Sequence, residues 1–299
     1  MFDFIGDIHG HADELQKLLL KLDYRKVNGV YMHPTRKVFF LGDFIDRGPQ
    51  IKETLAIAKA MVDAGTAVAI MGNHEYNAIC FHLEESQGGH LRKHSIKNIL
   101  QHADTLKQFQ NNEEEYEYYI AWFKSLPVFW EEPSFRAAHA CWDEENISFL
   151  RENLQQGVLN DRLVKQSVSK ETPLHRAVEE TLKGKEMALP DQTTFSDKDG
   201  NIRKEIRVRW WLNPAATSLY DYSVHAFDGL PKDPVNLVSG FYSETEKPIF
   251  FGHYWLKGIP KLIRNNVCCL DFSVAKGGSL AAYRFDGEQI LEPSKLVFV

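Results

Sequence analysis

Four short segments of the chain place a glycine directly before a side chain that can bind a metal ion. Each segment follows an apolar run, which is typical of a strand that ends in a tight turn at the carboxyl edge of a sheet. The segments are residues 6–10, 42–48, 72–75 and 252–253, and the apolar runs are residues 2–5, 38–41, 67–71 and 249–251. Carboxylate, amide and imidazole groups gathered from several strand ends predict a site for two divalent ions.

Six residues at these strand ends are the predicted metal ligands. They are Asp7, His9, Asp43, Asn73, His139 and His253. Asp7 and His9 are separated by one residue, so their side chains point the same way from an extended segment and can chelate one ion. Asp43 is the candidate bridge between the two ions, whereas Asn73, His139 and His253 are expected to complete the second. Two such ions about 3.5–4 Å apart clamp phosphoryl oxygens and activate water, so hydrolysis of phosphate esters is expected.

Residues beside the predicted ligands fit other steps of that reaction. Arg47 has the planar fork that suits two oxygens of a phosphate. Together with Asn73 it is predicted to contact the substrate. His74 directly follows Asn73 and is expected to act as a catalytic acid that protonates the departing oxygen. Asp46 is expected to assist by accepting the other N–H of that imidazole.

The hydrophobic pattern predicts how these residues are positioned. Strands and helices alternate over residues 1–75, with helices at 13–22 and 51–63, which favours parallel βαβ units. Polar segments at about 78–125 and 144–206 are interpreted as helical insertions in one domain that spans residues 1–299. A hairpin or loop is expected at 197–200, and β character from Trp210 onward. The later strands are predicted at residues 127–130, 135–139, 249–251, 267–272, 279–285 and 295–299.

Composition limits the classes of partner. The chain has 299 residues and a net charge of −6, which argues against general nucleic-acid binding and against binding to anionic membranes. It begins with a strand-like run and has no apolar stretch of membrane-spanning length, so neither a signal peptide nor a membrane span is expected. The four cysteines are scattered, which fits a reducing, cytoplasmic compartment.

The motifs together resemble the calcineurin-like metallophosphoesterase superfamily. Within it they are similar to the branch of Ser/Thr protein phosphatases, phage-type phosphatases and bacterial diadenosine tetraphosphatases. The resemblance rests on Gly-Asp-x-His-Gly from Gly6, Gly-Asp-x-x-Asp-Arg-Gly from Gly42, Gly-Asn-His-Glu from Gly72, His139-Ala140 and Gly252-His253. It implies a four-layer α/β/β/α sandwich and two metal ions, manganese first, with iron, zinc or cobalt also compatible. It also implies direct attack by a metal-bridging hydroxide.

Three functions remain open at this stage. The leading hypothesis is a phosphatase for phosphomonoesters, either phospho-Ser/Thr proteins or small phosphorylated metabolites. The alternative is a hydrolase of dinucleoside polyphosphates of the diadenosine tetraphosphate type. A third is a non-catalytic metal-binding scaffold, which His74 and Arg47 argue against because a scaffold has no physical need for them.

Two further expectations concern single residues. Eukaryotic members of the branch carry a second phosphate-binding arginine that does not align cleanly here. Arg207 and Arg209 are the candidates for that role, and Arg209 is the residue predicted to bind the substrate. His102, like the other histidines outside the motifs, is expected to be a surface or capping residue.

Overall fold

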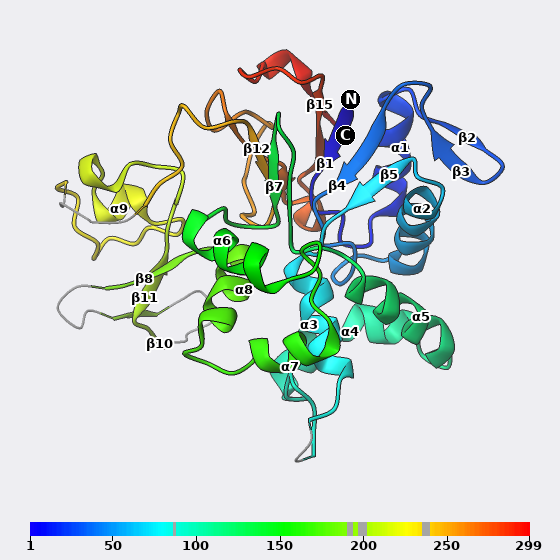
Figure 1. The fold of residues 1–299 in the computed structure, drawn as a ribbon, viewed down its shortest axis with the longest axis horizontal. Helices are drawn as coiled ribbons and strands as arrows, with labels where there is room; N and C mark the ends of the chain where they lie inside the picture. Colours follow the sequence, from blue (N-terminus) through cyan, green and yellow to red (C-terminus); the bar gives the residue numbers. More distant parts are fainter. Residues whose placement is uncertain (86–87, 190–193, 197–201, 235–239) are drawn as a thin grey trace.

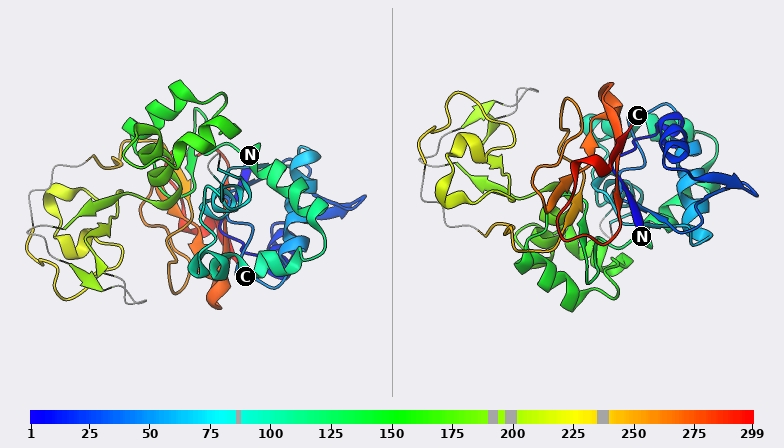
Figure 2. Two further views of the ribbon diagram at one scale, coloured as in Figure 1. Left: turned by 90° about the horizontal axis from the view of Figure 1, so that it is seen from below. Right: turned by 90° about the horizontal axis from the view of Figure 1, so that it is seen from above.

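The computed structural model describes residues 1–85, 88–189, 194–196, 202–234 and 240–299. The chain has a mixed α/β fold with several sheets, and the two termini lie near opposite ends of strand β15 (Figures 1 and 2). Within the described residues, no helix combines the length and apolar character needed to cross a membrane.

The first large sheet carries the N-terminal motifs. Its strand order is β14-β15-β1-β4-β5, with β16 paired to β15. β1, β4 and β5 are mutually parallel neighbours, whereas β15 runs antiparallel to β1. The parallel strands therefore end at one edge, as the sequence predicts. The bounds are β1 Phe2–Ile5, β4 Lys37–Phe40, β5 Ala67–Ala69, β14 Asp271–Phe272, β15 Ser279–Phe285 and β16 Leu296–Phe298.

The second sheet carries the two later histidine motifs. Its order is β13-β12-β7-β6, and β12 runs parallel to both β7 and β13. The bounds are β6 Phe129–Glu131, β7 Arg136–Ala138, β12 Ile249–Phe251 and β13 Val267–Cys269. The predicted strand at 267–272 is thus split at Leu270 into members of two sheets.

Aromatic side chains join the two sheets. Phe4 from β1 stacks on Phe250 from β12, with ring centroids 3.8 Å apart. Phe135 packs edge-on against Phe4 and Phe39, and all four rings are buried. Each such burial stabilises the fold by roughly 1.5–3 kcal/mol. This packing fixes the strand ends of one sheet relative to those of the other.

Two amphipathic helices pack on the first sheet, away from the second. α1 (Ala12–Lys21) and α2 (Ile51–Asp63) lie beside β1, β4 and β5 in Figure 1. Leu15, Leu18 and Leu19 of α1 are buried in the same core as Ile5 and Phe40. In the chain, β2 (Arg25–Val27) and β3 (Val30–Met32) follow α1 and form an antiparallel hairpin.

The polar segments are largely helical, as predicted, and Figure 2 shows them lying on both sides of the sheets. The short strand pair β8–β11 was not predicted, whereas the antiparallel pair β9–β10 lies on either side of the hairpin or loop expected at 197–200. The bounds are α3 Asn73–His82, α4 Ile96–Gln108, α5 Glu113–Lys124, α6 Glu144–Asn153, α7 Asp161–Ser167, α8 Pro173–Lys183, β8 Glu186–Ala188, β9 Phe195–Ser196, β10 Ile202–Arg203 and β11 Glu205–Arg207. The predicted turn at 197–200 lies outside the described residues.

The expectation of β character from Trp210 onward is wrong for the described residues that precede β12. The described residues between them form the 3₁₀ turn η2 (Pro214–Ala216) and the short helix α9 (Leu219–Tyr222), with isolated bridges but no ladder. Prolines at 214, 231 and 234 explain the difference, because proline has no N–H to donate to a ladder. Two further 3₁₀ turns, η3 (Val274–Lys276) and η4 (Pro293–Lys295), flank β15.

Candidate metal centre

The six predicted ligands converge at the facing ends of the two sheets. They follow or lie next to the ends of β1, β4, β5, β7 and β12. His9, Asp43 and His253 have φ values of 46°, 53° and 73°, in the left-handed region that L-residues rarely adopt. Strained backbone of this kind persists where surrounding structure enforces it, often at functional sites.

Asp43 lies at the centre of the cluster. Its Oδ2 is 3.3 Å from His139 Nε2, 3.6 Å from His9 Nε2 and 4.0 Å from His74 Nε2. Two groups of potential ligand atoms, each within 4.8 Å of one another, share this carboxylate: His9, Asp43 and His74, and Asp43, His139 and His253. A carboxylate common to two ligand groups is the arrangement that a bridging ligand requires.

Asn73 and Asp7 close the cluster. Asn73 Oδ1 lies 3.0 Å from His139 Nε2 and 2.7 Å from His253 Nδ1. Asp7 Oδ2 lies 4.0 Å from His9 Nε2 and accepts a 3.0 Å hydrogen bond from the His253 N–H. Side-chain oxygens and ring nitrogens of all six residues therefore meet in one buried space.

Backbone contacts hold two of the rings in the orientation that metal binding needs. The Nδ1 of His9 is 2.9 Å from Ile45 O, and the Nδ1 of His139 is 2.8 Å from Leu41 O. Donation from Nδ1 to a carbonyl orients the ring and turns Nε2 toward the cluster, as in metal-binding histidines. The residues present therefore fit two divalent ions.

Glycines allow two carboxylates to approach the adjacent backbone. A methyl group on Gly252 would overlap the Asp7 carboxylate, and one on Gly72 would overlap that of Asp43. These contacts explain why two of the four motifs begin with glycine.

The electrostatics of the cluster favour a bound cation. Burial and the negative charge of Asp271 raise the pKa of Asp7 well above its usual value. Burial also opposes ionisation of Asp43, but the positive charges of His139, His74 and His9, with the hydrogen bond from His139, together outweigh it and lower the pKa of Asp43. Burial would lower the pKa of His139, yet the Asp43 carboxylate raises it to about 10. Buried carboxylates that crowd together in this way need compensating positive charge.

The residues predicted beside the ligands lie at the rim. Arg47 donates a 2.8 Å hydrogen bond to His9 Nε2 and lies 3.8 Å from the centroid of the Trp255 ring. The His74 imidazole approaches Asp46 through Nδ1, while its backbone N–H donates to Asp43 Oδ1 at 3.0 Å. The structure thus brings Arg47, His74 and Asp46 to the cluster.

The expectation that His102 is a surface residue is wrong. His102 is buried, and its Nδ1 donates to Asp46 Oδ1 at 2.7 Å. Thr105 also donates to that oxygen, and Tyr116 lies 2.8 Å from His102 Nε2. Burial alone would raise the pKa of Asp46, but the hydrogen bonds from His102 and His74 keep it below its usual range. The first insertion therefore supports the proposed catalytic pair.

Glu75 is a second residue whose role was not predicted. It is fully buried and accepts hydrogen bonds from the backbone N–H groups of Asp43, Phe44 and Gly72, at 2.8, 2.8 and 3.0 Å. It therefore ties the turn after β4 to the turn after β5. The Gly-Asn-His-Glu motif contained it, but its spacing gave no indication of these partners.

The two candidate arginines occupy different places. Arg207 donates a 3.0 Å hydrogen bond to His253 Nε2, whereas the Arg209 side chain lines neither of the pockets at the centre. The Arg209 backbone N–H donates to Tyr222 O. Arg207, rather than Arg209, is the second arginine at the cluster.

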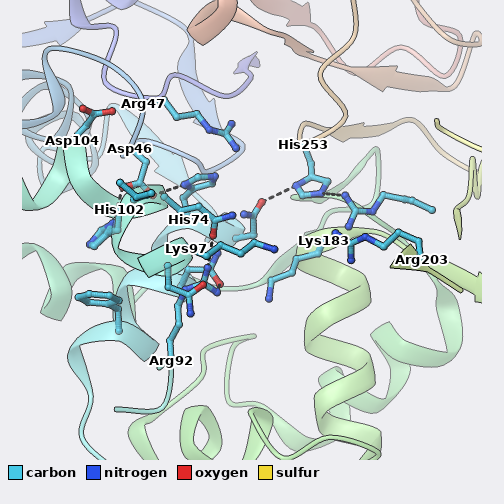
Figure 3. Close-up of a pocket in the computed structure, with 17 residues that line it drawn as sticks. Asp46, Arg47, His74, Arg92, Lys97, His102, Asp104, Lys183, Arg203 and His253 are labelled. Atoms are coloured by element: carbon cyan, nitrogen blue, oxygen red, sulfur yellow. Dashed lines mark hydrogen bonds and ion pairs between the residues drawn. The ribbon is translucent and has the colours of Figure 1, made fainter. Parts of the chain in front are cut away.

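Two pockets meet at the cluster. One, of about 570 Å³, is shown in Figure 3, and the other has about 520 Å³. Both are lined by Arg47, Arg207 and His253, so the two spaces adjoin at these residues.

A family model described as calcineurin-like phosphoesterase matches residues 1–188. The chain belongs to this family. It is therefore a metal-dependent phosphoesterase, as the motifs predicted.

Curated relatives are named as tetraphosphatases. The chain is 33% identical over 190 residues to the asymmetrical bis(5'-nucleosyl)-tetraphosphatase PrpE of Halalkalibacterium halodurans, which covers 61% of this chain and 74% of that protein. It is 25% identical over 310 residues to the symmetrical bis(5'-nucleosyl)-tetraphosphatase of Vibrio parahaemolyticus, which covers 98% of each. Alignments to several other PrpE proteins are shorter and span 30–44% of their length.

Among solved structures, a protein serine/threonine phosphatase from Saccharomyces cerevisiae has a TM-score of 0.50 at 12% identity. The alignment covers 100% of this chain and 78% of the other. This similarity concerns the fold.

Proposed function

We propose that the protein hydrolyses a phosphoanhydride bond in dinucleoside polyphosphates. The observation that carries the proposal is the pair of pockets that adjoin at Arg47, Arg207 and His253. A dinucleoside polyphosphate extends on both sides of the phosphorus that is attacked, whereas a phosphomonoester carries one organic group. The names of the curated relatives support the same choice over the phosphomonoester hypothesis.

The six ligands would hold two divalent ions, for which we propose Mn²⁺, with Asp43 between them. When bound, such ions stabilise charge on the phosphoryl oxygens and lower the pKa of a water molecule. Asp, Asn and His ligands also suit iron, zinc and cobalt. We further infer that the two packed sheets form the inner layers of a four-layer α/β/β/α sandwich within one domain.

The remaining residues bind the substrate and supply the proton that its departing oxygen takes up. Arg47 and Arg207 offer guanidinium groups to the phosphate from two sides, and Asn73 contributes its amide. Asp46 accepts from His74 Nδ1, which leaves His74 Nε2 facing the centre, 4.0 Å from Asp43 Oδ2. From that place His74 can donate a proton to the departing oxygen.

The test compares three substrates with Mn²⁺-loaded protein: diadenosine tetraphosphate, a phosphoserine peptide and p-nitrophenyl phosphate. We expect kcat/KM for diadenosine tetraphosphate to exceed that for the peptide by at least tenfold. Preferential cleavage of the peptide would restore the phosphomonoester hypothesis. No cleavage of any of the three would favour the scaffold.

A further inference from the structure

The pocket of about 570 Å³ is lined by more basic than acidic residues, although the net charge of the whole chain is −6. Its acidic lining residues are Asp46 and Asp104, and its basic ones are Arg47, Arg92, Lys97, Lys183, Arg203 and Arg207. Asp46 is already bound by His74 and His102. The space beside the metal centre is therefore positive.

Four of these cations lie beyond the arginines of the metal centre, and we call Arg92, Lys97, Lys183 and Arg203 the basic wall. They come from both insertions: Arg92 precedes α4, Lys97 lies in α4, Lys183 ends α8 and Arg203 lies in β10. Figure 3 shows Lys97 and Lys183 extending into the pocket from opposite sides. The insertions thus place positive charge around one space.

Arg92 has neutral partners within the part of the chain that the structure describes. Its Nη1 donates to Asn77 Oδ1 at 3.0 Å and its Nη2 to Gln101 Oε1 at 2.7 Å. Burial lowers its pKa, because a desolvated guanidinium is costly without a neighbouring carboxylate. Amide partners fix the orientation of the guanidinium without forming an ion pair, and the more distant charges of Asp46 and Glu179 compensate it only in part.

The two lysines of the basic wall differ in whether they form an ion pair. Lys97 is exposed and forms no ion pair with any described residue. Lys183 pairs with Glu179 and lies 5.5 Å from the Tyr76 ring centroid. Arg92 and Lys97 therefore have more charge to offer an anion than Lys183 has.

We propose that the basic wall binds the phosphates of a polyphosphate chain that lie beyond the phosphorus attacked at the metal centre. This inference rests on the proposed function, because it takes the substrate to be a polyphosphate. A phosphomonoester has no further phosphate to occupy the wall. The two insertions would then favour substrates that carry several phosphates over those that carry one.

The test measures competitive inhibition of p-nitrophenyl phosphate hydrolysis by orthophosphate and by tripolyphosphate, at a constant free Mn²⁺ concentration. We expect wild-type protein to bind tripolyphosphate at least tenfold more tightly than orthophosphate. Lys97→Ala should reduce this ratio about threefold, since an exposed ammonium is screened by water. Arg92→Ala should reduce it about tenfold, since its guanidinium is partly buried.

Lys107→Ala is the matched control, because Lys107 lies on α4 like Lys97 but does not line the pocket. It should leave the ratio at the wild-type value. Lys97→Arg should restore most of the ratio lost in Lys97→Ala. Lys97 is exposed, so its variants are expected to fold even if Arg92→Ala does not.

An equal affinity of wild-type protein for the two inhibitors would overturn the inference, as would a ratio unchanged in Lys97→Ala. The assay uses an aryl phosphate, so it does not depend on cleavage of a dinucleotide. If diadenosine tetraphosphate is not cleaved but the ratio behaves as expected, the proposed function fails and the basic wall stands. If it is cleaved and the ratio is one, only the basic wall fails.

Discussion

Glu75→Gln tests how the two strand-end turns are held together. Glu75 Oε2 accepts from the N–H groups of Asp43 and Gly72, and Oε1 accepts from that of Phe44. Glutamine has one acceptor oxygen. In its better orientation it keeps the first two bonds and turns its NH₂ toward the N–H of Phe44. The substitution therefore removes one buried hydrogen bond and leaves two donors facing each other.

Losing a hydrogen bond to a charged acceptor costs about 1.5–3 kcal/mol. Part of that cost is offset, because burial and the nearby Asp43 raise the pKa of Glu75 to about 7 and make its charge unfavourable. We therefore expect the free energy of unfolding of the metal-free protein to fall by about 1–2 kcal/mol. Because the loosened turns carry Asp43 and Asn73, we expect Mn²⁺ affinity to fall about 10- to 100-fold.

Urea unfolding measures the first quantity and titration calorimetry with Mn²⁺ the second. Glu53→Gln is the matched control, since it makes the same chemical change at an exposed position of α2. If Glu75→Gln unfolds and binds Mn²⁺ as Glu53→Gln does, the bonds from Glu75 do not position the ligands.

Other substitutions test the surroundings of the centre. His102→Ala should lower kcat about tenfold with little change in KM, because Asp46 loses a partner that orients it; a change in KM alone would contradict this. Arg47→Lys should raise KM for p-nitrophenyl phosphate about tenfold, because lysine lacks the planar fork; an unchanged KM would exclude a phosphate contact. The hydrogen bond from Arg36 lowers the pKa of Asp286, so its stabilising contribution is present above about pH 4 and is lost as pH falls below that value. Asp286→Asn should therefore lower the free energy of unfolding by at most about 1 kcal/mol at pH 6, because Asp286 is largely exposed, and by less at pH 3. Urea unfolding of both proteins at the two pH values measures this difference. A difference that is larger at pH 3 than at pH 6 would contradict the prediction.

Much of the metal centre could be predicted from sequence because its geometry follows from local rules. Asp7, Asp43 and Asn73 each lie within four residues of the end of a parallel strand of one sheet, and parallel neighbours end at the same edge. His139 and His253 follow β7 and β12. The apolar runs predicted both strands, but the sequence did not predict that these strands pair.

The rest depends on contacts between distant segments. Asp46 and His102 are 56 residues apart and meet only because α4 packs beside α2 and the turn after β4. Neither residue has a local pattern that predicts the other. Arg207 and Arg209 could not be separated either, since alternate residues of a strand share one face. β11 ends at Arg207, so Arg209 lies outside the strand, and of the two only Arg207 lines the pockets.

The most direct test of the account is a count of the divalent ions that the folded chain binds. Titration of metal-free protein with Mn²⁺, read by calorimetry and by elemental analysis after dialysis, should give two ions per wild-type chain. Asp43→Asn should hold one ion or none and lose p-nitrophenyl phosphate hydrolysis, because both groups of ligands share that carboxylate. Two tightly bound ions in Asp43→Asn, or a fully active wild-type chain with none, would contradict it.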